Sequence, residues 1–210
     1  LVANSTAHYA GRVGPGQTLS LNAYDIANNG KNHFIWCGVT NGSGKLNLTF
    51  ADAAGHVLGQ ASVYLQIKDI KQMYERWTVG DVSAKPPETA AHLAQDNLPP
   101  GQTAFQYGPA TTNTTYILHV HGYNMPTWAK ARFAETEYKR LYWQGYQGRF
   151  GAFDWPTAAN AIQFGSSESQ AWLSAQGLLN KLEDLNNEYP GQVYLTVHSL
   201  GNVVAGEALR

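Results

Sequence analysis

Between residues 115 and 210 the chain alternates short apolar runs with stretches of helical periodicity, and this alternation limits the possible folds more than any other feature. The apolar runs are TYILHVH (115–121), GRFGAFDW (148–155) and QVYLTVH (192–198). Runs of this length without strict alternation are typical of strands buried on both faces of a parallel sheet. Right-handed crossovers would wind three β-α units into an α/β fold.

The segments between these strands have the features of amphipathic helices. One helix is expected to begin near Thr127, and a third near Leu200. The middle helix is expected to open with Ser167 and Gln170 as a capping box and to end at Pro190. Its apolar stripe comprises Ala171, Trp172, Ala175, Leu178, Leu179, Leu182 and Leu185.

The first part of the chain follows a different period. Apolar residues alternate with polar ones at 18–23, 46–50 and 57–67, and HFIWCGV (33–39) is a further apolar run. Alternation of this kind predicts half-buried strands, so residues 1–78 are expected to form a small β-sandwich-like accessory module. So few strands leave open sheet edges, which either missing sequence or docking on a neighbouring domain would cover.

A short amphipathic helix is expected to close this module. Ile70, Met73, Tyr74 and Trp77 have the spacing of one helix face, and Asp69 precedes them as an N-cap. Residues 79–114 contain five prolines and little periodicity, so we expect a linker there. The α/β domain then spans residues 115–210.

Composition excludes several function classes. The net charge is −1 and only 14% of residues are charged, so we expect no nucleic-acid partner. Cys37 is the sole cysteine, which rules out an internal disulfide. No apolar run is long enough to span a membrane and no signal peptide opens the chain. Abundant Asn, Gly, Thr and Tyr favour a secreted or cell-surface bacterial protein, and the start at Leu1 favours a piece of a longer chain.

Ser199 is the strongest candidate for a reactive residue. It lies between the third apolar run and the helix expected from Leu200. A sharp turn from strand to helix presents the side chain of its central residue above the sheet and needs small flanking residues. Gly201 meets this need, whereas Val197 does not. The alternative is that Ser199 is an ordinary helix N-cap.

The sequence HGYN (121–124) provides a second element of this site. His121 and Gly122 follow a buried strand, and a glycine there lets the loop fold back so that the Tyr123 N–H faces the serine. With the Leu200 N–H it would form an oxyanion hole of two backbone donors. We expect His121 to hold this loop by a hydrogen bond to the backbone.

Three motifs together resemble a known family. A strand ending in HGYN, a second running into FDWPT (153–157) and a third entering VHSLGN (197–202) are similar to the α/β-hydrolase superfamily, in particular to bacterial α/β hydrolases of unannotated substrate. The resemblance covers residues 115–210, the N-terminal half of such a domain. It implies Ser199 as nucleophile, the Tyr123 and Leu200 amides as oxyanion donors, and an ester of a small molecule or lipid as substrate. Val197 departs from the family pattern.

The resemblance also implies residues that this chain lacks. In this fold the catalytic acid and histidine follow the serine along the chain, but residues 200–210 contain Glu207 as the only acid and no histidine. We therefore expect the fragment to be inactive and the parent protein to be a serine hydrolase. The alternatives are a non-catalytic surface or adhesion protein with a degenerate hydrolase domain, and acyl transfer at the same site.

Other polar residues near the expected sheet edge are expected to have structural roles. His119 and His121 lie two apart on one strand, as metal ligands do, but no further ligand follows at suitable spacing. We expect neither a metal nor a cofactor. Asp154 is expected to cap a loop. Trp155, Trp128 and Tyr123 are expected either to line a substrate pocket or to belong to the core and its rim.

Overall fold

The computed structural model describes residues 11–21, 38–80, 91–93, 115–157 and 162–210. Two compact units divide the chain, Leu1–Val39 and Thr40–Arg210. In the first unit the described residues 11–21 form a turn and no strand, so the strand expected at 18–23 is absent up to residue 21. Residues 22–23 of that strand and residues 33–37 of the predicted run HFIWCGV lie outside the described residues.

The second unit contains a five-stranded sheet with the order β4-β3-β6-β5-β7. Its strands are β3 (Glu75–Val79), β4 (Ala91–Leu93), β5 (Tyr116–Val120), β6 (Arg149–Asp154) and β7 (Val193–Val197). Strands β3, β6, β5 and β7 are parallel, and β4 pairs antiparallel with β3. All three strands expected after residue 115 are present, and the predicted α/β class is confirmed.

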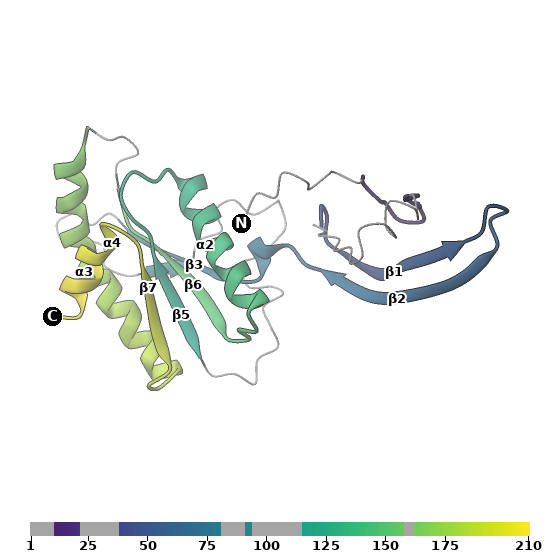
Figure 1. Ribbon diagram of the computed structural model, residues 1–210. Coiled ribbons are helices and arrows are strands. Elements are labelled where there is room, and N and C mark those ends of the chain that lie inside the picture. The colour runs from purple at the N-terminus through teal and green to yellow at the C-terminus, as the bar shows by residue number, and fades with distance from the viewer. Residues whose placement is uncertain (1–10, 22–37, 81–90, 94–114, 158–161) are drawn as a thin grey trace. The chain divides into compact units, whose positions relative to one another are not determined.

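Helices cover both faces of this sheet (Figure 1). Helix α2 (Thr127–Trp143) packs on one face, where Tyr138 and Phe150 stack with ring centroids 5.0 Å apart. Helices α3 (Phe164–Glu188) and α4 (Gly201–Ala208) pack on the other face. The core on that side contains Tyr116, Leu118, Val120, Phe153, Leu178, Leu185 and Val204. Side chains alternate between the two layers along each strand because a strand has a period of two.

The segment from residue 70 to 79 differs from the expected helix. A 3-10 helix, η1 (Ile70–Gln72), is followed directly by strand β3. Asp69 does act as the N-cap, since its side chain accepts a hydrogen bond of 3.0 Å from the Lys71 N–H. Aromatic and β-branched residues favour the strand that follows. β3 pairs with β6, so the five-stranded sheet includes residues assigned from sequence to the accessory module.

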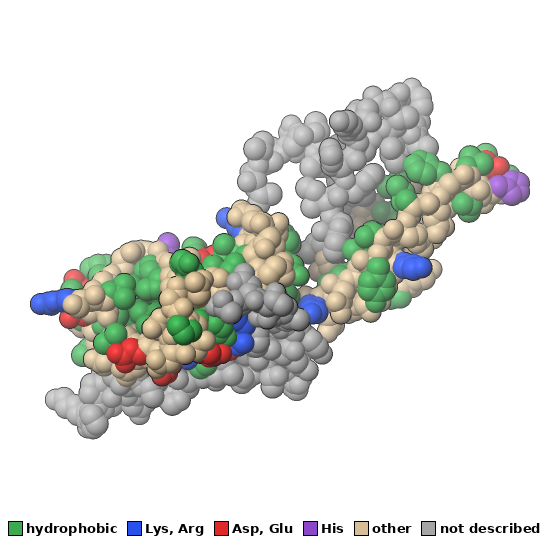
Figure 2. All heavy atoms as spheres, turned by 90° about the horizontal axis from the view of Figure 1, so that it is seen from below, with side chains coloured by type: hydrophobic (Ala, Val, Ile, Leu, Met, Phe, Trp, Pro, Cys, Tyr) green, Lys and Arg blue, Asp and Glu red, His purple; other side chains and the backbone are tan. Residues whose placement is uncertain are grey.

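The first part of this unit is a two-stranded antiparallel sheet. Strands β1 (Gly42–Ala51) and β2 (Val57–Ile67) form a hairpin, and Gly55 in its loop has φ 87°. Leu46, Leu48 and Phe50 alternate along β1 as predicted, but all of them are exposed. Figure 2 shows hydrophobic side chains along the hairpin. The described residues contain one sheet of this module, not the two of a sandwich.

Helix α3 begins earlier than the capping box predicts. Gln163 is its N-cap, and Ser167 lies inside the helix, fully buried, where its Oγ accepts a hydrogen bond of 3.3 Å from Thr157 Oγ1. The predicted end is confirmed, because the helix stops at Glu188, before Pro190. No helix among the described residues is long and apolar enough to cross a membrane.

Candidate active site

Ser199 occupies a sharp turn between β7 and α4 and has φ 52°. A residue with a Cβ rarely adopts this left-handed conformation, because Cβ approaches the neighbouring carbonyl oxygen. Hydrogen bonds hold the turn: His198 N–H donates to Val120 O at 3.0 Å, and both the Asn202 N–H and its side-chain amide donate to Ser199 O. Ser199 itself is exposed at the carboxyl edge of the sheet.

Gly201 lets helix α4 start directly against strand β5. A Cβ placed on Gly201 would lie 2.5 Å from His121 O and 2.9 Å from Val120 O, which real Cβ atoms do not approach. This close packing is the role expected for the small residue after the serine. On the other side of the turn, Val197 pairs with Val120 and packs at the margin of the core, so its larger side chain is accommodated.

The loop after β5 lies against the serine turn. A Cβ on Gly122 would lie 2.8 Å from Ser199 Cβ and 2.7 Å from His198 Nδ1. Asn124, at the end of the same loop, has φ 57°. Asn124 and Ser199 are the only non-glycine residues with positive φ in the described part of the chain. Strained backbone therefore concentrates in the two loops that meet here, as is common at functional sites.

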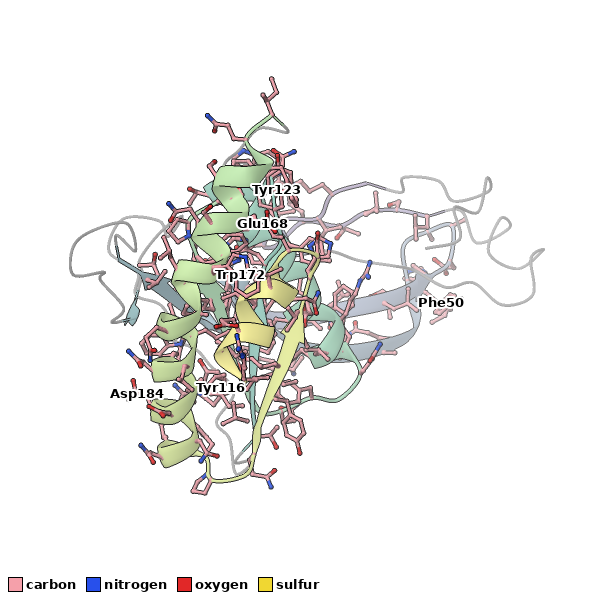
Figure 3. All side chains as sticks on the ribbon, turned by 90° about the vertical axis from the view of Figure 1, so that its left-hand side faces the viewer. Phe50, Tyr116, Tyr123, Glu168, Trp172 and Asp184 are labelled. Atoms are coloured by element: carbon pink, nitrogen blue, oxygen red, sulfur yellow. The ribbon has the colours of Figure 1, made fainter. Side chains whose placement is uncertain are left out.

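Tyr123 fixes the position of this loop relative to α3. Its ring packs edge-on against Phe164, with centroids 5.3 Å apart. Figure 3 shows Tyr123 near the first turns of α3, on the same side as Glu168, whereas Tyr116 lies at the opposite end of the sheet. The Tyr123 ring therefore contacts the helix that follows the second strand, rather than the core of the sheet.

The Leu200 amide begins helix α4. Leu200 is the N-cap of α4, and its N–H forms no hydrogen bond with any residue that the structure describes. The first N–H groups of a helix have no partner within the helix and carry part of its positive dipole. A negatively charged oxygen next to Ser199 would therefore find a donor here.

His121 connects the loop to the sheet from beneath. It is 2% exposed, and its Nδ1–H donates to Gly122 O at 2.8 Å. The Trp155 indole N–H donates to His121 O at 2.8 Å, and the two rings stack 5.2 Å apart at an angle of 3°. The expected hydrogen bond from His121 to the loop backbone is present.

The second nitrogen of His121 faces a charged pair. Nε2 lies 3.1 Å from Asp154 Oδ1 and 3.2 Å from the Trp155 N–H, which donates to it in the neutral ring. Lys130 Nζ forms an ion pair with the same Asp154 oxygen and donates to Trp155 O at 3.1 Å. Asp154 is thus part of a buried network and does not merely cap a loop.

These contacts shift the acidity of both groups. Burial lowers the pKa of His121, against the opposing effect of the Asp154 carboxylate. For Asp154, burial alone would raise the pKa, but the interaction with the adjacent His121 ring and the charge of Lys130 hold it below its usual value. Near neutral pH we therefore expect a neutral imidazole beside an ionised carboxylate.

The structure thus brings together the residues that the sequence nominated. Gly122 and Gly201 lie against the turn that carries Ser199, and His121 lies under the loop. Sequence reasoning missed Lys130, which reaches Asp154 from helix α2. The only indication in the sequence was the position of Lys130 next to Ala131, which is buried in the structure. That position does not identify the residue with which Lys130 pairs. His119 in β5 and His121 just beyond its end line the same cavity, but the described residues contain no group of three potential metal ligands.

A parallel sheet covered by helices on both faces, with a serine held at positive φ in a strand-to-helix turn, is the architecture of an α/β hydrolase. Residues 107–210 match the model of a family described as "Alpha/beta hydrolase of unknown function (DUF900)", so this segment of the chain is similar to that α/β-hydrolase family. Comparisons with curated proteins and with solved structures gave no significant match.

Proposed function

We propose that the protein is a serine hydrolase that cleaves carboxylic esters or related acyl bonds, with Ser199 as its nucleophile. The observation that carries this proposal is the left-handed backbone of Ser199, at φ 52° on an exposed turn. An N-cap serine has no need of this conformation, because N-cap residues have extended backbones. The strain is explained if the hydroxyl must project from the sheet edge toward a substrate.

In this mechanism Ser199 Oγ attacks the acyl carbon, and the carbonyl oxygen becomes an oxyanion. The Leu200 and Tyr123 N–H groups would donate to that oxygen. Two observations support this assignment: the N–H of Leu200 has no hydrogen-bond partner among the described residues, and Gly122 lies close to Ser199. Removing one such donor costs roughly 3 kcal/mol of transition-state stabilisation in measured enzymes.

A base must take the proton of the serine hydroxyl. Within the described residues no histidine forms a hydrogen bond with Ser199, and His121 is engaged with Gly122 and Asp154. We assign the base and its carboxylate partner to residues that follow Arg210 in the whole protein, in the chain order usual for this fold. The 210-residue chain alone is then expected to have little turnover.

The direct test is labelling of the full-length protein with a fluorophosphonate probe, which reacts with activated serines. We expect labelling of the wild type and of the control variant Ser166→Ala, which removes another exposed serine hydroxyl. Ser199→Ala is expected to abolish labelling. Labelling that persists in Ser199→Ala, or a wild type that never reacts, would contradict the assignment.

A non-catalytic binding role is the second candidate. The exposed apolar side chains of Leu46, Leu48 and Phe50 on the hairpin favour it, since such side chains are common at interaction surfaces. A folded protein without Ser199 labelling would support this role. Acyl transfer at the same serine would instead give faster product formation with an added alcohol than with water. A secreted or surface location stays a prediction from composition.

A further inference from the structure

A row of side chains crosses the sheet beneath helix α2. Arg76 on β3 is in register with Ala152 on β6, which is in register with His119 on β5, and His119 with Thr196 on β7. Residues in register on parallel strands point to the same face. Arg76 and His119 therefore flank Ala152, whose methyl group is too small to fill the space between them.

A cavity of about 20 Å³ lies at this position, and Arg76, His119 and Ala152 are in its wall. A volume of roughly 10–15 Å³ is the minimum for one water molecule. The cavity therefore has room for a single water or an ion of one atom, but not for a polyatomic acid. The size of the cavity therefore allows two kinds of occupant, a water molecule or a monatomic ion.

The charge of Arg76 favours the ion. Arg76 is 5% exposed; its Nε–H donates to Tyr74 Oη at 3.1 Å and its Nη2–H to Lys71 O at 2.9 Å. These acceptors are neutral, and among the described residues no carboxylate forms an ion pair with Arg76. Nη1 is buried and has no hydrogen-bond partner in the part of the chain that the structure describes. A buried charge without a counterion is strongly unfavourable, so a buried cation implies a nearby anion.

His119 supplies the opposite wall. It is 2% exposed, and Nδ1 lies 2.7 Å from a Glu137 carboxylate oxygen, which can only accept a hydrogen bond. Nδ1 therefore carries hydrogen. Nε2 is buried and forms no hydrogen bond with any residue that the structure describes. When His119 is protonated, Nε2–H is a second donor into the cavity, and Glu137 balances the charge of the ring.

The other charged groups of the wall are already balanced. Lys130 and Asp154 both line the cavity and form an ion pair with each other. The carboxylate of Asp154 also lies beside His121 Nε2. The guanidinium of Arg76 is thus the cation of the wall that lacks a counterion among the residues that the structure describes.

We propose that this cavity is a binding site for a small monatomic anion of the halide class, held above Ala152 between Arg76 Nη1–H and the Nε2–H of the charged form of His119. The site lies outside the proposed hydrolytic centre, and His119 links it to strand β7, which leads into that centre. His119 Nδ1 lies 3.2 Å from Thr196 Oγ1, and Phe133 packs against both His119 and His198. Occupation of the site therefore stabilises the packing of β7 and α2.

Chloride is the probe for the first experiment. The thermal unfolding midpoint of the full-length protein is measured at constant ionic strength while chloride replaces methanesulfonate, which is too large for the cavity. We expect a saturable rise of about 5 °C in the wild type and in the control Gly206→Ala. Ala152→Val, which fills the cavity, is expected to unfold at a midpoint independent of chloride. A wild-type midpoint independent of chloride would overturn the proposal.

Bromide gives a second readout that does not depend on any variant. Crystals of the wild type grown in bromide are expected to show an anomalous peak between Arg76 Nη1 and His119 Nε2. Density at that point without an anomalous signal would identify the occupant as water. That result would overturn the proposal even if Ala152→Val failed to fold.

Discussion

Gly122 approaches Ser199 so closely that a methyl group on Gly122 would lie 2.8 Å from the Ser199 Cβ. The two residues belong to loops at the ends of adjacent parallel strands, β5 and β7. Because Gly122 has no side chain, its loop can lie close to the Ser199 side chain. The first prediction tests this dependence.

Gly122→Ala is expected to displace the loop from the serine turn. If the Tyr123 amide is an oxyanion donor, the rate of Ser199 labelling in the full-length protein should fall by roughly 100-fold, as when one such donor is removed. Gly165→Ala, at a glycine with open space around it, should label as the wild type does. Equal labelling rates for Gly122→Ala and the wild type would show that the loop does not contribute.

Gly201→Ala is expected to destabilise the protein by about 1–3 kcal/mol, because its new Cβ meets the Val120 and His121 carbonyl oxygens. The gain in helix propensity offsets only about 1 kcal/mol of this cost. Gly206→Ala in the same helix meets nothing within 4 Å and should be stabilising by about 0.5–1 kcal/mol. Urea unfolding measures both changes, and equal effects would contradict the packing argument.

Lys130→Met is expected to destabilise the protein by about 2 kcal/mol, because it leaves the half-buried Asp154 carboxylate without its cation. Lys139→Met, an exposed lysine of the same helix, should have almost no effect. In a double-mutant cycle, Asp154→Asn should relieve most of the cost of Lys130→Met. Additive effects of the two substitutions would mean that the residues are not coupled.

The lowered pKa of His121 predicts how stability depends on pH. Below about pH 6.5, the usual value, the unfolded chain binds a proton at His121 that the folded protein does not bind, so stability falls on acidification. Asp154 acts in the same direction at lower pH: its lowered pKa contributes stability above about 3.8, which is lost as the pH falls through the folded value.

The measurement is urea unfolding between pH 7.5 and 5. The loss of stability over this range should be smaller in His121→Asn than in the wild type, because the titrating group has been removed. His198→Asn, which removes an exposed imidazole, is the control. A pH dependence unchanged in His121→Asn would assign the effect to other groups.

Local patterns in the sequence were sufficient for the strands and turns around the candidate site. β5, β6 and β7 are short apolar runs, and Ser199 is followed by glycine at the required position. The turn conformation depends on residues within a few positions of each other. For this reason the φ of Ser199 and the packing of Gly201 follow from the sequence.

Contacts between distant residues were not predictable in the same way. Over the eight residues from Ile70 to Trp77, a tight turn followed by a strand gives the same apolar spacing as a helix, and pairing with β6 decides between them. Arg76 and His119 are far apart in sequence and meet the same cavity only because strand order places β6 between their strands. A single sequence contains no local signal of that order.

The left-handed backbone at Ser199 also has an evolutionary consequence. Glycine would adopt φ 52° without steric conflict, so serine is the less stable residue at this position. Selection for stability alone would not preserve the hydroxyl. If Ser199 is the nucleophile that we propose, relatives that have lost the activity are expected to carry glycine at this position, and relatives that retain the activity are expected to keep serine.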